Sequence, residues 1–376
     1  VDYLRVGGLV DKIPSQLNEL EYGRFSRRFE LEASQQVLAM KPRPVVLSHD
    51  ISESPNFAQL ARQGVDCLSI LHVDVVDYFQ RFYLGDRLPA FWWTWFHRQT
   101  RQLPWPDLLK LVFEKQLQAA QHCRHLIVPS ARMVRILHDC YPHLPHGRVQ
   151  VIPWGSPVAQ CDRSEVEAAK DRLREAWRLH PQAPLILTLS RIAPEKAQDE
   201  LLKALKIGEE RGAIPAGLTV AIVGAPSYMM GQSFLEKLKK LASQLRRVRV
   251  LFPGHLGGPD KRAALEMASQ FVVCSRHESY GLTIMEAMAA GLPIVARASY
   301  GVEATLDSTC GTVLEEGRDL AFRLWTQIET NLNNPDQARA MGRAGAAKAG
   351  QQNFLEAAHR LLQLCRGSHS GAQLKV

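Results

Sequence analysis

Short apolar runs recur along the chain, and most of them end in small or polar residues. They lie at 45–50, 67–72, 125–130, 149–153, 185–190, 218–224, 248–254, 271–275 and 293–296. Runs that stay hydrophobic without alternation are typical of strands buried on both faces, as in parallel sheets covered by helices. Between them lie stretches with helical patterns, such as 165–177, 197–210 and 233–247. The alternation predicts an α/β fold with doubly wound parallel sheets.

The best candidate for a linker is residues 153–166, PWGSPVAQCDRSEV, which are rich in turn formers and precede a charged helical segment. Four predicted strands come before it and five or six after it. Two sheets are therefore expected, and a length of 376 residues also favours two domains. We expect an N-terminal domain over 1–155, a second domain over 156–352, and a C-terminal helix and tail over 353–376 that could pack back on the first domain.

Composition narrows the class of protein. An apolar content of 46% with 22% charged residues is ordinary for a globular chain. A net charge of +8 suits phosphate-bearing ligands, nucleic acid or an anionic membrane surface, and does not choose among them. Because the basic residues are dispersed, we expect no nucleic-acid partner.

The cysteines and the apolar runs indicate the cellular compartment in which the protein is expected. The seven cysteines are scattered and never form C-x-x-C, which argues against a disulfide framework or a zinc cage and favours a reducing compartment. No apolar run approaches the ~18 residues of a membrane-spanning helix. No signal peptide is recognised at the start of the sequence, so a cytoplasmic protein is expected.

Residues 277–296, HESYGLTIMEAMAAGLPIVA, hold two glutamates. Glu278 is expected in a strand-to-helix loop, and Glu286 in the first turn of a helix that begins near Thr283. The free amides of 281–283 would form an anion site suited to a diphosphate. Carboxylates beside it could accept hydrogen bonds from sugar or ribose hydroxyls.

The same spacing has a purely structural interpretation. Thr283-x-x-Glu286 fits a capping box, in which the glutamate ties off the helix start. An acidic residue in a first helical turn is favourable in any case. Spacing alone leaves both interpretations open.

The loop SRIAPEK, residues 190–196, directly follows a predicted strand. Arg191 and Lys196 would lie at the carboxyl end of that strand, where ligands of open α/β sheets bind. A guanidinium and an ammonium there could neutralise a leaving diphosphate. Taken alone, Lys196 also fits a solvated basic loop.

Together these pieces resemble the retaining family-4 glycosyltransferases. Residues 278–296 look like the E-x7-E signature of that family. VQVIPWG, TLSRIAPEK, FPGHL and SYGVEATLDSTCGTVLEEG resemble its other motifs and occur in the family's order. The resemblance covers 125–317 and implies the GT-B fold, in which two Rossmann-like domains face a cleft.

The resemblance also implies an activity: transfer of a sugar from a nucleotide diphosphate sugar with retention at the anomeric carbon and without a metal ion. Glu286 would hold the ribose hydroxyls and Glu278 the donor sugar. The diphosphate would be bound by Arg191, Lys196 and the amides of Gly281, Leu282 and Thr283. No cofactor is expected, and the absence of D-x-D agrees with metal independence.

Two histidines that end predicted strands match positions where the family often has one. By this analogy His72 would face the donor sugar near its 6-hydroxyl. His49 would be structural or lie on the acceptor side. A histidine at a strand end is also commonly a structural group. His122, His125, His143 and His146 could suggest a metal site, but no carboxylate or cysteine pattern supports one.

Three departures from the family pattern stand out. Trp154 replaces the asparagine of the interdomain motif, and Ala197 replaces a glycine of the phosphate loop. Family members carry further strands and a glycine-rich loop before the position of 45–50, and Gly7-Gly8 is too weak to count as that loop. We therefore expect an N-terminal domain that is shortened or a chain that is a fragment.

Residues 87–105 are rich in aromatic and basic side chains, which suggests a peripheral membrane contact at the inner face of a membrane. The residues concerned are Arg87, Trp92, Trp93, Trp95, Arg98 and Arg101. Domain packing and stacking on sugar rings are the alternatives.

The sequence thus predicts a hexosyltransferase that uses a nucleotide diphosphate sugar and a glycan, lipid-linked or small-molecule acceptor. Front-face transfer is expected because no residue stands out as a covalent nucleophile. The competing hypotheses are a GT-B scaffold protein that binds nucleotide sugars with impaired catalysis and a GT-B nucleotide-sugar epimerase. The sequence names neither the sugar nor the base.

Overall fold

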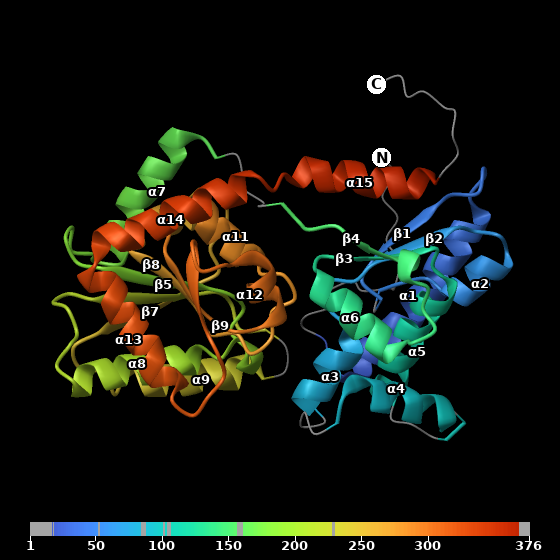
Figure 1. Ribbon diagram of the computed structural model, residues 1–376, viewed down its shortest axis with the longest axis horizontal. Coiled ribbons are helices and arrows are strands. Elements are labelled where there is room, and N and C mark those ends of the chain that lie inside the picture. Colours follow the sequence, from blue (N-terminus) through green and yellow to red (C-terminus); the bar gives the residue numbers. More distant parts are fainter. Residues whose placement is uncertain are drawn as a thin grey trace. The chain divides into compact units, whose positions relative to one another are not determined.

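The computed structural model describes most of the chain. The described residues are 17, 19–51, 53–83, 88–100, 102–103, 107–155, 161–227 and 230–367. The chain divides into two compact units (Figure 1). Unit 1 comprises 1–153 and 355–376, and unit 2 comprises 154–354.

Unit 1 is built on a four-stranded parallel sheet in the order β1-β2-β3-β4. Its strands are β1 (Val46–His49), β2 (Cys67–Ile70), β3 (His125–Val128) and β4 (Val149–Val151). Its helices are α1 (Glu19–Ala39), α2 (Phe57–Arg62), α3 (Val75–Tyr83), α4 (Ala90–Gln99), α5 (Asp107–His122) and α6 (Ala131–Cys140). Every residue of β2 is buried, as the unbroken apolar run predicts for a strand covered on both faces.

The last described helix, α15 (Phe354–Arg366), is bound to unit 1 by hydrogen bonds to backbone carbonyls. Arg124 donates to the carbonyl oxygens of Leu364 and Cys365, and Arg360 Nη2 donates to Val151 O at 3.1 Å. The chain therefore returns to unit 1 after completing unit 2.

Unit 2 contains a six-stranded parallel sheet in the order β10-β9-β8-β5-β6-β7. Its strands are β5 (Leu185–Leu189), β6 (Thr219–Val223), β7 (Arg249–Gly254), β8 (Gln270–Val273), β9 (Ile294–Arg297) and β10 (Gly311–Leu314). Its helices are α7 (Arg163–Ala176), α8 (Gln198–Glu210), α9 (Gly231–Ala242), α10 (Gly258–Met267), α11 (Leu282–Ala289), α12 (Tyr300–Thr305), α13 (Leu320–Asn333) and α14 (Pro335–Gly350).

The core of unit 2 joins the sheet to the helices that cover it. Trp325 on α13 is fully buried and packs in one cluster with Leu201 and Leu205 of α8. Its ring lies so close to Gly208 that a Cβ on this glycine would come within 2.5 Å of it. The absence of a side chain at Gly208 lets α8 and α13 approach each other.

Each of the nine predicted apolar runs contains a strand, with boundaries that shift by one or two residues. The strand order reverses between β5 and β8, because the chain runs from β5 outward to β7 and then returns to β8 on the other side of β5. The loops that leave such a switch point diverge and form a crevice at the carboxyl edge of the sheet. Among the described residues, no helix has the length and apolar character needed to cross a membrane.

Candidate active site

The loop after β5 is held in a defined shape by its own backbone and by the start of α8. Residues 194–196 form a 3₁₀ turn, and Ala197 adopts φ 47° and ψ 39° before α8 begins. Gln198 Nε2 donates hydrogen bonds to Ser190 Oγ at 2.9 Å and to Arg191 O at 2.8 Å. The loop that carries the two predicted cations is thus tied to the helix that follows it.

The loop after β8 lies directly against it. The Arg276 amide donates to Glu195 O at 2.8 Å, which joins the two loops at the switch point. Glu278 O in turn accepts from the amide of Gly301, at the start of α12. Backbone contacts therefore place Glu278 on a surface shared by three segments.

The central contact of the site is an ion pair between the two loops. Lys196 Nζ lies 2.8 Å from Glu278 Oε2, and the two side chains are 12% and 17% exposed. The two residues are 82 positions apart in the sequence, and the strand order brings them together. Both were predicted as donor-site residues.

Arg191 is placed at the open side of the same loop. Its side chain is 44% exposed, and its Nη2 atom lies 3.7 Å from Oε1 of the buried Glu195. The guanidinium can reorient toward a ligand at little cost, because an exposed pair at this distance contributes little free energy.

Helix α11 begins at Leu282, and Gly281 at its N-cap has φ 84° and ψ 55°. An L-amino acid rarely adopts this conformation, which explains the glycine. The first intrahelical donors to Gly281 O are the amides of Ile284 and Met285. The amides of Leu282 and Thr283 precede them at the positive end of the helix, which is suited to an anion.

The capping-box interpretation of Thr283 and Glu286 is wrong. The N-cap is Gly281, so Glu286 is the fifth residue of α11 and lies beyond its first turn. Its carboxylate is 8% exposed and pairs instead with Lys261 of α10, whose Nζ lies 2.6 Å from Oε1. The helix starts earlier than the pattern predicted because glycine at positive φ can begin a helix without a side-chain cap.

Two contributors to the site were missed by sequence reasoning. Lys261 lies in a mixed-charge segment, where nothing distinguishes it from a solvated lysine. Tyr280, between Glu278 and Gly281, donates its hydroxyl to Trp154 O at 2.6 Å and contacts Gln352 Oε1 at 2.5 Å. The loop after β8 is thereby anchored to the first and the last segment of unit 2.

The two predicted histidines lie together in unit 1, at the carboxyl ends of the adjacent strands β1 and β2. His49 Nδ1 and His72 Nε2 are 3.3 Å apart, and the rings stack with centroids 5.6 Å apart. Burial, and secondarily the charge of His49, lower the pKa of His72. His72 is therefore neutral near pH 7. The role of each histidine toward a ligand stays a prediction.

Asp50, next to this pair, has φ 64°, and burial raises its pKa to about 6. Among the described residues, no group of three histidine, cysteine or acidic side chains is arranged to hold a metal ion. Of the predicted aromatic and basic surface, Trp92, Trp95 and Arg98 are exposed on α4. Arg87 and Arg101 lie outside the described residues.

The model of the family "Glycosyl transferases group 1" matches residues 169–363, which is more than half of the chain. The chain belongs to the group 1 glycosyl transferases. The matched region contains Lys196, Glu278 and Glu286 together with the loops that carry them.

Two curated relatives of this glycosyl transferase are enzymes named for transfer to inositol-containing acceptors. The chain is 35% identical over 186 residues to the GDP-mannose-dependent alpha-(1-6)-phosphatidylinositol monomannoside mannosyltransferase of Mycolicibacterium smegmatis, with 47% of this chain and 46% of the relative covered. It is 29% identical over 265 residues to the D-inositol 3-phosphate glycosyltransferase of Thermomonospora curvata, with 69% and 60% covered. The chain thus spans about half to three fifths of these relatives.

Similarity to solved structures extends over both units. The Anabaena HepE structure in complex with UDP and glucose matches with a TM-score of 0.64 at 16% identity, and the match covers 94% of this chain and 84% of that chain. Together with the two helix-covered parallel sheets, this shows the GT-B fold with two Rossmann-like domains.

Proposed function

We propose that this glycosyl transferase moves a hexose from a nucleotide diphosphate sugar to an acceptor hydroxyl, with retention of the anomeric configuration and without a metal ion. The observation that carries the proposal is the Lys196–Glu278 ion pair beside the N-terminus of α11, at the switch point of the six-stranded sheet. Cations, helix amides and carboxylates meet there, which is the set of groups that a sugar diphosphate requires.

In this proposal the ion pair opens when the donor binds. A phosphate oxygen competes with Glu278 for the Lys196 ammonium, and the α11 amides and Arg191 bind the remaining phosphate charge. Glu278 then accepts hydrogen bonds from hydroxyls of the donor sugar. Before the donor binds, the ion pair thus keeps the Lys196 and Glu278 side chains in position. Neither side chain has to move in from solvent.

Glu286 is the proposed partner of the ribose hydroxyls. The Lys261 contact at 2.6 Å fixes one carboxylate oxygen, which leaves the other to accept from the ribose. Lys261 is in this view a positioning residue. It fixes the position of the nearly buried Glu286 side chain.

During transfer, the bond from the anomeric carbon to the diphosphate oxygen breaks, and negative charge develops on the leaving group. Lys196, Arg191 and the amides of Leu282 and Thr283 stabilise this charge. The acceptor oxygen forms its bond to the anomeric carbon on the same face, and its proton passes to the departing phosphate. His72, neutral near pH 7, would bind a hydroxyl of the donor sugar.

The acceptor is proposed to be a glycan, a lipid-linked sugar or a small polyol. The names of the two curated relatives, which cite phosphatidylinositol mannoside and inositol phosphate, support a polyhydroxylated acceptor. A cytoplasmic location is proposed because all seven cysteines are free.

The test is transfer from a panel of UDP-, GDP- and ADP-hexoses to candidate acceptors, with the anomeric configuration of the product read by NMR. Retained configuration without added metal supports the proposal, and an inverted product contradicts it. Arg191→Ala should lose ~100-fold or more in kcat. The control is Arg339→Ala, an exposed arginine of α14 that pairs with Asp336; it should keep full activity. Tight donor binding by the wild type with no turnover would instead support a scaffold protein.

A further inference from the structure

Helix α4 presents its aromatic side chains to solvent. Four aromatic residues, Phe91, Trp92, Trp95 and Phe96, are between 40% and 47% exposed. At 100° per residue they fall within an arc of about 140°, so they share one side of the helix. We refer to these four residues as the α4 aromatic face.

The opposite side of α4 is polar and faces the protein. Thr94 and His97 are 3% and 2% exposed. Thr94 Oγ1 donates to Cys140 O of α6 at 3.0 Å, and the His97 ring stacks on Phe113 of α5 with centroids 5.1 Å apart. A helix at the surface of a soluble protein normally has the reverse arrangement. These contacts fix α4 with its aromatic side outward.

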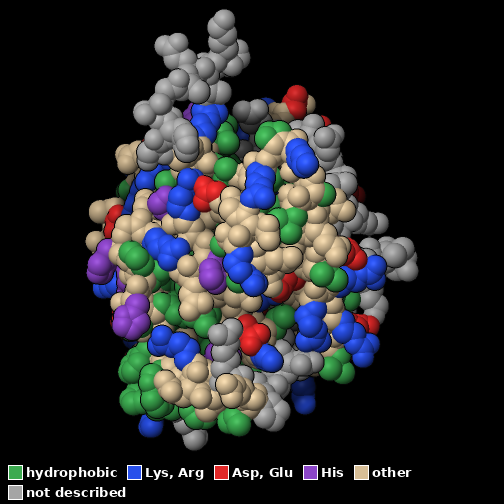
Figure 2. All heavy atoms as spheres, turned by 90° about the vertical axis from the view of Figure 1, so that its right-hand side faces the viewer, with side chains coloured by type: hydrophobic (Ala, Val, Ile, Leu, Met, Phe, Trp, Pro, Cys, Tyr) green, Lys and Arg blue, Asp and Glu red, His purple; other side chains and the backbone are tan. Residues whose placement is uncertain are grey.

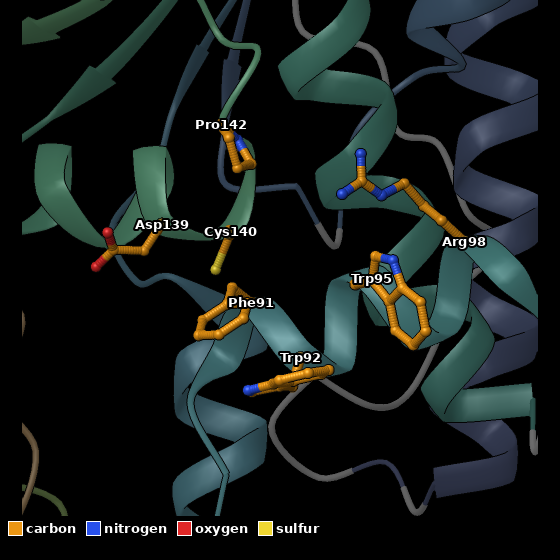
Figure 3. Close-up of a pocket in the computed structure, with 7 residues that line it drawn as sticks. All are labelled: Phe91, Trp92, Trp95, Arg98, Asp139, Cys140 and Pro142. Carbon is orange, nitrogen blue, oxygen red and sulfur yellow. The ribbon is translucent and has the colours of Figure 1, made fainter.

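The α4 aromatic face continues into a hollow. A pocket of about 390 Å³ is lined by Phe91, Trp92, Trp95, Arg98, Asp139, Cys140 and Pro142. In the space-filling view, hydrophobic side chains gather at the lower edge, at the level at which Figure 1 draws α4 (Figure 2). The close-up shows the Asp139 carboxylate pointing away from the aromatic rings (Figure 3). The hollow is therefore mainly apolar.

The formally charged residue of α4 is a cation. Arg98 on α4 is exposed and lines the pocket, whereas the Asp139 carboxylate points away from the rings (Figure 3). Asp139 is the acidic residue at the pocket, and the whole chain carries a net charge of +8. An anionic surface complements this distribution, whereas a two-fold contact between copies would bring like charges together.

We propose that the α4 aromatic face docks on the interfacial region of an anionic lipid bilayer. Tryptophan combines a large apolar ring with a polar N–H group, and it concentrates where acyl chains meet headgroups. Aromatic side chains that insert at this depth beside arginines are typical of helices that lie in the membrane plane. The proposal goes beyond the transfer reaction, and its test requires no nucleotide sugar.

The experiment is co-sedimentation with vesicles of phosphatidylcholine alone and of phosphatidylcholine with about 30 mol% phosphatidylglycerol. The wild type is expected to bind the anionic vesicles and to bind the neutral ones more weakly. Trp92→Ser/Trp95→Ser should reduce binding to anionic vesicles by ~10-fold or more. The matched control is Phe322→Ser on α13, an aromatic residue that is 48% exposed in unit 2 and should leave binding unchanged.

Two further variants separate the contributions of charge and ring. Arg98→Gln should weaken binding to anionic vesicles by ~5-fold, because a cation near an anionic surface is attracted to it. Trp92→Phe/Trp95→Phe keeps the apolar rings and should retain most of the vesicle binding. This variant tests the role of the rings if the serine variant does not fold.

Three results would overturn the proposal. The wild type could leave both kinds of vesicle unbound, or the serine variant could bind like the wild type. The third result is a dimer in light scattering, abolished by Trp92→Ser/Trp95→Ser, without vesicle binding. That result would assign the α4 aromatic face to a second copy of the chain.

Discussion

Asp50 is held in an unfavourable state by both its backbone and its side chain. Its φ of 64° lies in the left-handed region, and its pKa is raised to about 6, mainly by burial. Residues held in this way cluster at functional sites. Asp50 directly follows His49 at the end of β1, and the family resemblance implies that His49 is structural or lies on the acceptor side.

Asp50→Asn should stabilise the protein at pH 8 by about 2 kcal/mol more than at pH 4.5. The folded-state pKa of about 6 exceeds the ordinary 3.8, so the stability contributed by the protonated carboxyl is lost as the pH rises from about 4 through 6. Asparagine stays neutral, tolerates positive φ and can still accept from the Ile51 amide. Urea unfolding at both pH values measures the difference. An equal effect at the two pH values would contradict the assignment of the raised pKa.

Lys261→Met should weaken donor binding ~10-fold and cost about 1–3 kcal/mol of stability, because it leaves the Glu286 carboxylate nearly buried without its cation. Lys203→Met is the control. Lys203 pairs with Glu200 on α8, is 50% exposed, and should cost less than about 0.5 kcal/mol. Calorimetry with the preferred donor and urea unfolding provide the two readouts. Unchanged donor affinity in Lys261→Met would show that Glu286 is not part of the donor site.

At the residue scale the sequence predicted where the candidate residues lie better than it predicted their contacts. Glu278 and Lys196 were placed at strand ends from the apolar runs and the resemblance, and they form an ion pair. The partner of Glu286 could not be predicted, because Lys261 comes from a helix whose packing depends on the whole domain.

At the scale of elements, the start of α8 shows the cost of a departure from the family pattern. Ala197 takes the place of a glycine and adopts the left-handed conformation at φ 47°. Its side chain is fully buried in the core of unit 2. The strain of positive φ therefore opposes the gain from burying a methyl group.

Ala197→Gly should change the free energy of unfolding by less than about 0.5 kcal/mol, because relief of ~1 kcal/mol of backbone strain offsets the lost methyl group. Ala204→Gly is the matched control. Ala204 is also fully buried on α8, but it lies within the helix and should cost about 1.5–2 kcal/mol. Urea unfolding of both variants measures the two changes in the free energy of unfolding. Equal losses would show that the conformation of Ala197 is not strained.

Helix boundaries and helix orientation were harder to predict than the presence of helices. The capping-box pattern misplaced the start of α11, because the spacing of Thr283 and Glu286 does not reveal that Gly281 adopts a positive φ at the N-cap. The aromatic and basic content of α4 was predicted from the sequence. Its outward orientation depends on Thr94 and His97, which contact α6 and α5, and such contacts leave no local pattern.

At the scale of the whole molecule, the apolar runs predicted two parallel sheets with helices between the strands, and this is confirmed by the structure. The order of strands within each sheet could not be predicted, because every run has the same character. That order creates the switch point between β5 and β8 and brings together two loops about 80 positions apart in the sequence. The location of the proposed site is therefore a property of the domain.

The central claim is that these two loops bind the donor diphosphate. The most direct test is hydrogen exchange followed by mass spectrometry, with the full chain and each member of a panel of UDP-, GDP- and ADP-hexoses. At least one donor should slow exchange in both 190–197 and 276–286, and Lys196→Met should abolish that protection. Turnover of a donor with exchange unchanged in both segments would contradict the account.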